Sequence, residues 1–214
     1  VDLEKKQCVI QKRVALGFDA ISFNTGITPS FSVPGAEKYS VPVKPIAQFY
    51  PQWEGIKQRL LTSNISCNIA VAGGGAAGIE LALAMQHALQ DSDQTHQFHL
   101  FQKGLGLPDN YPPAFQKKLA AVFKSRGIQT HKGSAITQID ETSSAGGGRN
   151  LQIHLSNSQD KLGTVFSELF WCTQAVAPTW PKKSGLACDA NGFIKVNHAL
   201  QSTSHKFVFA AGDI

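Results

Sequence analysis

The sequence predicts an α/β protein with a Rossmann-like, doubly wound parallel sheet and an antiparallel β-meander, flanked by partial β segments of a second domain. Three observations lead to this fold class. A glycine run joins a short apolar strand to a helix over 67–90, and a second strand and helix follow over 96–127. Three strand-like runs without an intervening helix then occupy 135–174. Alternating strands and helices are typical of a parallel sheet, and consecutive strands of an antiparallel meander.

The first 33 residues alternate short apolar runs with polar residues, which predicts a hairpin followed by a buried strand. That strand ends in a Thr25-Gly26 turn, and Pro34-Gly35 closes the block. A connector containing several prolines follows. It leads into a helix that carries Trp53, Ile56 and Leu60 at helical spacing.

The central block opens with CNIAVA, which suits a strand buried on both faces. The following AAGIELALAMQHALQ is rich in strong helix formers. HQFHLFQK is the next predicted strand, and PPAFQKKLAAVFKSRG the next helix. In this second helix we expect Phe115, Leu119 and Val122 to form the buried stripe, and Gly127 to end the helix.

The runs AITQIDE, LQIHLS and TVFSELFWCTQ predict the meander, with the turn GGGRN between the first two. The last block contains an Asn-Gly turn and then an alternating strand over 193–196. A final buried strand, FVFAA, ends at Gly212-Asp213.

Composition narrows the class of protein. The chain has 214 residues, is 42% hydrophobic and carries a formal net charge of +5. Its basic residues are dispersed, without the long block typical of a nucleic-acid-binding arm, so we expect no nucleic-acid partner. No segment approaches the roughly 18 uninterrupted apolar residues of a membrane span, and the first residues lack the apolar core of a signal peptide. The four cysteines have no metal or redox spacing, so we expect a cytoplasmic protein without a metal site.

The glycine run has the G-x-G-x-x-G spacing of a dinucleotide-binding loop. Its first glycine allows a tight turn, its second lets a pyrophosphate approach the backbone, and its third lets helix and strand pack closely. Phosphates would then lie on free N–H groups at the helix N-terminus. The alternative is a purely structural turn. The candidate cofactor-binding residues are Gly73, Gly74, Gly75, Ala76, Ala77 and Gly78.

An NAD site usually has an acidic residue at the end of the next strand, which accepts hydrogen bonds from the ribose hydroxyls. Here the expected position is Gln102, followed by Lys103. An amide can still bind a hydroxyl, whereas an ammonium favours a 2′-phosphate. The sequence therefore leans away from a strict NAD site without establishing NADP. For Lys103 alone, a solvated surface lysine is the favoured interpretation over a phosphate contact.

Three ordered motifs resemble the pyridine nucleotide-disulphide oxidoreductase family, particularly its type II NADH dehydrogenase branch. They are FDAISFNTGITP, VAGGGAAGIELA and VFAAGDI. The run from WCTQAV to the end also resembles the flavoprotein module found fused to selenide, water dikinase. That likeness implies a fused or downstream selenophosphate-synthesising domain as a partner.

The family resemblance implies an FAD domain into which an NAD(P)H domain is inserted, with hydride passing from nicotinamide to flavin. The expected division is a nucleotide-binding domain at 34–170 and partial FAD-domain segments at 1–33 and 171–214. No residue is expected to act as a catalytic acid or base, because the cofactors carry the reaction. The resemblance places Glu80 towards the nicotinamide half of NAD(P)H. In the full-length protein it places four residues at FAD: Thr25, Gly26, Gly212 and Asp213.

Two features depart from the family pattern. The FAD pyrophosphate loop of such proteins would lie upstream of this chain, so we interpret the chain as a truncated fragment that is inactive by itself. The usual Thr-Gly at the second crossing between domains is replaced by Thr173-Gln174. The competing hypothesis is a degenerate, non-catalytic nucleotide-binding or docking module of a fusion protein, which Gln102 and Gln174 favour.

Overall fold

The computed structural model describes residues 1–10, 14–143, 149–157, 163–173 and 175–214. The chain forms two compact units. A continuous unit comprises 29–174, and a discontinuous unit comprises 1–28 together with 175–214. The predicted GGGRN turn and Gln174 fall wholly or partly outside the described residues.

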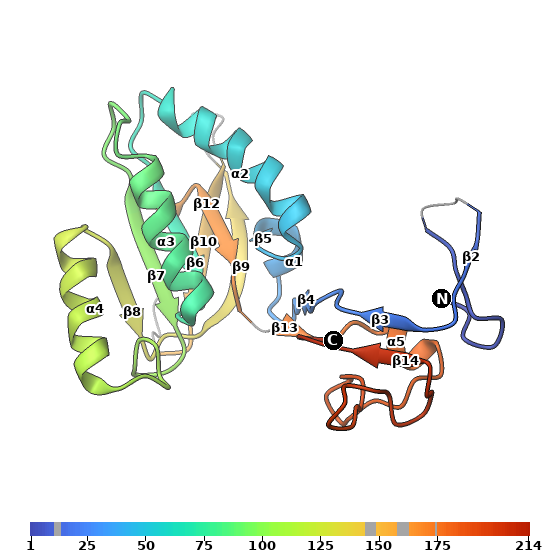
Figure 1. Ribbon diagram of the computed structural model, residues 1–214. Coiled ribbons are helices and arrows are strands. Elements are labelled where there is room, and N and C mark those ends of the chain that lie inside the picture. The colour runs from blue at the N-terminus through green and yellow to red at the C-terminus, as the bar shows by residue number, and fades with distance from the viewer. Residues whose placement is uncertain (11–13, 144–148, 158–162, 174) are drawn as a thin grey trace. The chain divides into compact units, whose positions relative to one another are not determined.

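The continuous unit is built on a parallel sheet (Figure 1). Its strands, in spatial order, are β5 (Val41–Pro42), β12 (Glu168–Trp171), β6 (Asn68–Ala72), β7 (Gln97–Gln102) and β8 (Gln129–Lys132). Every neighbouring pair is parallel, with Val71 opposite both Leu100 and Phe170. Four of the five β6 residues are buried, as expected for a central strand covered on both faces.

Helices α2 (Ile46–Leu61), α3 (Ala76–Ala88) and α4 (Pro113–Ser125) pack on one face of this sheet (Figure 1). Their buried side chains meet alternate residues of the strands, including Ile69 and Val71 of β6. Each helix has one apolar side, and this side is buried against the strands. The residues that α2, α3 and α4 place in this core are Phe49, Trp53, Leu60, Ile79, Ala82, Met85, Leu119 and Phe123.

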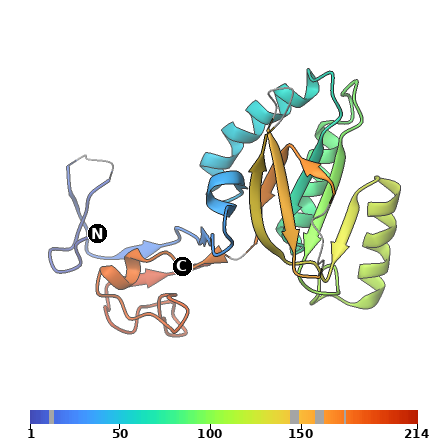
Figure 2. The same cartoon turned by 180° about the vertical axis from the view of Figure 1, so that it is seen from behind.

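The antiparallel meander covers the other face of the sheet (Figure 2). It consists of β9 (Ile136–Thr142), β10 (Asn150–Leu155) and β11 (Val165–Phe166), with β10 in the middle. The short helix α1 (Ala36–Tyr39) packs in the same core. The fold class predicted from the sequence is therefore confirmed as an α/β fold with a parallel sheet and antiparallel strands.

Two details predicted for the continuous unit were wrong. The run at 164–174 is two strands: β11 belongs to the meander, and β12 belongs to the parallel sheet. All four β12 residues are buried, as expected for a strand that is covered on both faces of the sheet. In α4, Leu119 is buried as predicted, but Phe115 and Val122 are 44% and 42% exposed, and Phe123 is buried in their place. The predicted and the observed buried stripes share Leu119, and the stripe that packs against the sheet is the one that includes Phe123. Strand β8 was not predicted.

The discontinuous unit contains a parallel pair, β3 (Ile21–Phe23) and β14 (Val208–Ala210). Its predicted hairpin is formed by β1 (Gln7–Cys8) and β2 (Leu16–Gly17). A second short pair joins β4 (Thr28–Pro29) to β13 (Ala175–Val176), and helix α5 (Trp180–Lys183) follows. The predicted strand at 193–196 is reduced to isolated bridges. No helix within the described ranges has the length and hydropathy of a membrane-spanning segment.

Candidate functional site

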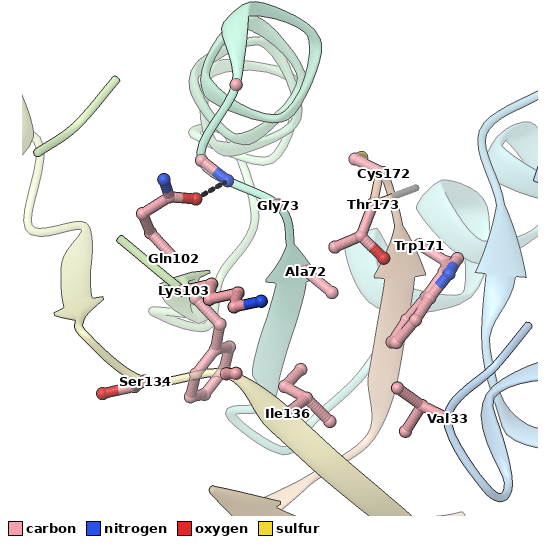
Figure 3. A pocket seen from close by; sticks show the side chains of 14 residues that line it. Val33, Ala72, Gly73, Gln102, Lys103, Ser134, Ile136, Trp171, Cys172 and Thr173 are labelled. Atoms are coloured by element: carbon pink, nitrogen blue, oxygen red, sulfur yellow. Dashed lines mark hydrogen bonds between the residues drawn. The ribbon is translucent and has the colours of Figure 1, made fainter. Parts of the chain in front are cut away.

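A pocket of about 300 Å³ opens at the carboxyl ends of β6, β7 and β12 (Figure 3). This edge is where ligands bind in open parallel sheets, because the strand-to-helix turns converge there. The sequence passes from β6 outward to β7 and β8, while β12 and β5 lie on the other side of β6. The pocket lies at that reversal. Its lining residues are Val33, Ala72–Gly75, Phe101–Lys103, Ser134–Ile136 and Trp171–Thr173.

The glycine run forms the turn between β6 and α3, as predicted. Gly73 has φ +113°, a backbone conformation that other residues rarely adopt, and its N–H donates to the Phe101 carbonyl at 2.9 Å. A Cβ added to Gly78 would lie 1.8 Å from the Gly73 carbonyl oxygen. The first and third glycines therefore allow the turn and the close packing of α3 against the strand.

The N-terminus of α3 offers unpaired donors to the pocket edge. Gly75 is the N-cap and provides no side-chain cap. Within the described part of the chain, the N–H groups of Gly75, Ala76 and Ala77 donate to no acceptor. A Cβ added to Gly75 would meet nothing within 4 Å. Open space beside free N–H groups at the positive end of a helix is the arrangement that binds phosphate.

Gln102 has both ends of its amide engaged. Its Oε1 accepts a hydrogen bond from the Gly74 N–H at 3.0 Å, shown by the dashed line in Figure 3. Its Nε2 donates to Oδ2 of Asp109 at 2.6 Å. A Cβ on Gly74 would lie 2.8 Å from the Gln102 side chain, so the close approach of the amide requires glycine there.

Asp109 was missed by the sequence reasoning. It ends the loop Gly-Leu-Gly-Leu-Pro-Asp that follows β7, and its Oδ1 accepts from the Gly106 N–H at 2.7 Å. The available signal was an acidic residue closing a glycine- and proline-rich loop directly after the strand end.

Lys103 is exposed, and its side chain extends across the pocket in the direction of β6 (Figure 3). It is the one charged residue in the described lining. Lys103 makes no hydrogen bond or ion pair with a described residue, so its ammonium group is available to an anion.

The opposite wall is largely apolar. Val33, Ile136 and the ring of Trp171 lie together there, and the Trp171 Nε1 donates to the Ser30 carbonyl at 3.0 Å (Figure 3). This hydrogen bond fixes the ring, and Trp171 as a whole is only 3% exposed. Burial raises the pKa of the neighbouring Cys172 thiol to about 12, so this thiol is protonated at neutral pH.

The other predicted residues are not among those that line this pocket. Glu80 is exposed on α3 and is not part of the lining. In the discontinuous unit, Thr25-Gly26 follows β3 and Gly212-Asp213 follows β14. Because these strands are parallel and Ala210 is opposite Phe23, both turns lie at the same edge of the pair. A Cβ added to Gly212, which has φ +75°, would lie 2.6 Å from Oδ1 of Asn24.

Comparisons with known proteins agree with this architecture. The sequence profile of the pyridine nucleotide-disulphide oxidoreductase family matches residues 1–214. The NADH dehydrogenase-like protein YutJ of Bacillus subtilis is 23% identical over 142 residues, which are 66% of this chain and 38% of that protein. Ferroptosis suppressor protein 1 of Xenopus laevis is 20% identical over 217 residues, 100% of this chain and 54% of that protein.

The fold is also shared with solved structures. The water-forming NADH oxidase of Lactobacillus brevis, solved with NADH bound, has a TM-score of 0.72 at 20% identity. The match covers 100% of this chain and 44% of the oxidase. At this identity the likeness shows the fold alone. The chain spans between 32% and 54% of the length of the curated relatives it matches.

Proposed function

Because the chain belongs to the pyridine nucleotide-disulphide oxidoreductase family, we propose that its continuous unit binds NAD(P)H within a longer FAD-dependent NAD(P)H oxidoreductase. One observation carries the proposal. The uncapped N–H groups of Gly75, Ala76 and Ala77 border open space at the carboxyl edge of the sheet. That cradle fits a pyrophosphate, which needs several backbone donors and tolerates no side chain at Gly75.

Each part of the pocket has a role in this proposal. The loop N–H groups hold the pyrophosphate, and Lys103 supplies the positive charge that the dianionic group favours. The apolar wall of Val33, Ile136 and Trp171 excludes water from a flat ring. When bound, the nicotinamide supplies the hydride and the flavin accepts it. The chain contributes binding and orientation, so no side chain of the unit needs to transfer a proton.

The discontinuous unit is proposed to contribute to FAD binding in the longer parent protein. Thr25-Gly26 and Gly212-Asp213 share one edge of a parallel strand pair, the edge at which ligands bind in such sheets. The exposed Asp213 carboxylate would accept hydrogen bonds from the hydroxyls of the flavin ribityl chain. Glu80 keeps its proposed place on the nicotinamide side. This arrangement supports the proposal that the chain is the nucleotide-binding part of a larger flavoprotein.

A second function is favoured by one observation. Gln102 stands where an acidic residue usually reads the ribose, and its amide is already bound to Gly74 and Asp109. A unit that had lost dinucleotide binding would serve as a docking module for a fused enzyme. The resemblance of residues 171–214 to a flavoprotein module supports a selenophosphate-synthesising partner domain. Intact mass of the native polypeptide tests this, because a fusion exceeds the mass of the flavoprotein alone.

Calorimetric titration of the chain with NADH, NADPH and ADP tests the proposed function. A Gly75→Val variant places its side chain in the space reserved for the pyrophosphate. Gly55→Val is the matched control, because Gly55 lies on α2 and a Cβ there also meets nothing within 4 Å. Loss of nucleotide binding in Gly75→Val, with binding kept in Gly55→Val, supports the cofactor site. A folded chain that binds none of the three nucleotides supports the docking module.

A further inference from the structure

We propose that Asp109 is the carboxylate that recognises the adenosine ribose of the bound dinucleotide, and that it makes the site prefer NADH to NADPH. This inference rests on the proposed function. The usual position for the ribose acid is the end of β7, which holds the neutral Gln102. The structure supplies a carboxylate next to that position from a residue seven places later in the chain.

The Gln102 amide links the carboxylate to the glycine loop. It accepts from the Gly74 N–H with Oε1 and donates to Asp109 with Nε2, so its two ends face opposite neighbours. An amide held this way cannot turn to offer both groups to a ribose. Gln102 is therefore a positioning residue, and the group it positions beside the loop is the carboxylate of Asp109.

The loop after β7 is folded around the same carboxylate. Asp109 Oδ2 accepts from Gln102 Nε2 at 2.6 Å, and Oδ1 accepts from the Gly106 N–H at 2.7 Å. A Cβ added to Gly104 would lie 1.8 Å from Oδ2, and one added to Gly106 would lie 2.8 Å from the Asp109 Cα. Both glycines thus leave room for this side chain. The carboxylate is held from two directions before any ligand arrives, which lowers the entropic cost of binding.

The fixed carboxylate still has acceptor capacity. A carboxylate has about four lone-pair sites, and the two hydrogen bonds occupy two of them. Asp109 is exposed, so the remaining sites are open to solvent. A ribose diol presents two O–H donors, which this acceptor matches. A 2′-phosphate presents oxygens and negative charge instead, which a carboxylate repels.

Lys103 would favour NADPH, whereas Asp109 would favour NADH. The side chains of these two residues differ in how firmly they are fixed in place. Lys103 is exposed and has no described partner, so binding a phosphate would cost the rotamer entropy of a long side chain. Asp109 is already immobilised by two hydrogen bonds. The preorganised group decides the preference, and the site selects the cofactor with a free 2′-hydroxyl.

The test is the ratio of the dissociation constants for NADPH and NADH, measured by titration of the chain. The unmodified chain should bind NADH more tightly. Asp109→Asn removes the charge, so NADH binding should weaken about tenfold to a hundredfold, the range for a lost hydrogen bond to a charged group. The NADPH constant should change little or improve. Asp91→Asn removes an exposed charge beyond the C-terminal end of α3 and is the matched control.

Asp109→Glu keeps the charge and is the control for the case in which the loop no longer folds in Asp109→Asn. It should still disfavour NADPH. Tighter binding of NADPH by the unmodified chain, or an unchanged ratio in a folded Asp109→Asn, would overturn the assignment of Asp109 while leaving the proposed function intact. If neither nucleotide binds to the folded chain, and the Gly75→Val variant gives the same result, the proposed function and this assignment are both overturned.

Discussion

His99 and His131 are joined across the neighbouring strands β7 and β8, with Nδ1 of the first ring 3.0 Å from Nε2 of the second. The planes of the two rings are nearly parallel, 10° apart, and His131 also stacks on Phe101. His99 is 4% exposed, and its Nε2 has no hydrogen-bond partner among the described residues. A hydrogen bond between two ring nitrogens needs one of them as an acceptor, so at least one ring is neutral.

The histidine pair makes the stability of the continuous unit depend on pH. Burial, followed by the neighbouring His131, lowers the pKa of His99 to about 4, and burial also lowers the pKa of His131. The unfolded chain therefore binds protons that the folded chain does not. Stability is fully present above the unfolded pKa of about 6.5 and is lost as the pH falls towards 4, by up to about 3 kcal/mol for His99.

Urea unfolding between pH 7.5 and pH 4.5 measures this loss. His99→Leu removes one of the two titrations, so the free energy of unfolding should fall less steeply with decreasing pH than in the unmodified chain. Parallel curves for the two proteins would contradict the role given to His99.

The buried Glu168 forms an ion pair with Arg59, whose side chain is 55% exposed. Removing the arginine leaves a carboxylate buried without its partner, whereas removing the carboxylate leaves an arginine that reaches solvent. We expect Arg59→Leu to destabilise the chain by about 2 kcal/mol, a value reduced from that of a fully buried pair because Arg59 is half-exposed. Arg59→Leu combined with Glu168→Gln should recover part of the loss, as a double-mutant cycle in urea will show.

Gly78 is required by the contact between α3 and the glycine turn. Gly78→Ala places a Cβ 1.8 Å from the Gly73 carbonyl oxygen, so helix and strand must separate. Alanine favours a helix over glycine by about 1 kcal/mol, but the backbone clash outweighs this gain by several kcal/mol. Thermal unfolding should show a lower Tm for Gly78→Ala. Gly55→Ala has open space on α2 and should raise the Tm slightly.

Two phenylalanines of α4 provide a test of which helix face is buried. Phe123 is 1% exposed and Phe115 is 44% exposed. We expect Phe123→Ala to cost about 3–5 kcal/mol through the cavity it leaves. Phe115→Ala should stay within about 0.5 kcal/mol of the unmodified chain. Equal losses for the two variants in denaturant unfolding would contradict the observed orientation of the helix.

The features that could be predicted from sequence are those set by neighbours along the chain. The strand, glycine turn and helix over 67–90 were predicted because steric demands at Gly73 and Gly78 act locally. The place of β12 between β5 and β6 could not be predicted, since strand order depends on packing between distant segments. The helix α4 was predicted, but its buried stripe was wrong for another reason: two stripes through Leu119 fit the same periodicity, and packing against the sheet determines which is buried.

The site divides in the same way. The loop glycines follow from spacing, whereas Asp109 enters through the shape of an irregular loop that periodicity does not describe. The contact of His99 with His131 depends on the register between two strands separated by a helix. Hydrogen bonds of this kind link residues whose spacing in the sequence does not indicate that they are in contact.

The strand that completes the core of the sheet is synthesised last. Phe170 of β12 meets the rings of Phe49 and Trp53 on α2 at centroid distances of 6.1 Å and 5.9 Å. β5 pairs with the sheet through β12. During vectorial synthesis, α2 therefore leaves the ribosome more than 100 residues before its aromatic partner. Until then the apolar face of α2 lacks this aromatic contact, and exposed apolar surface of this kind promotes aggregation of an incompletely folded chain.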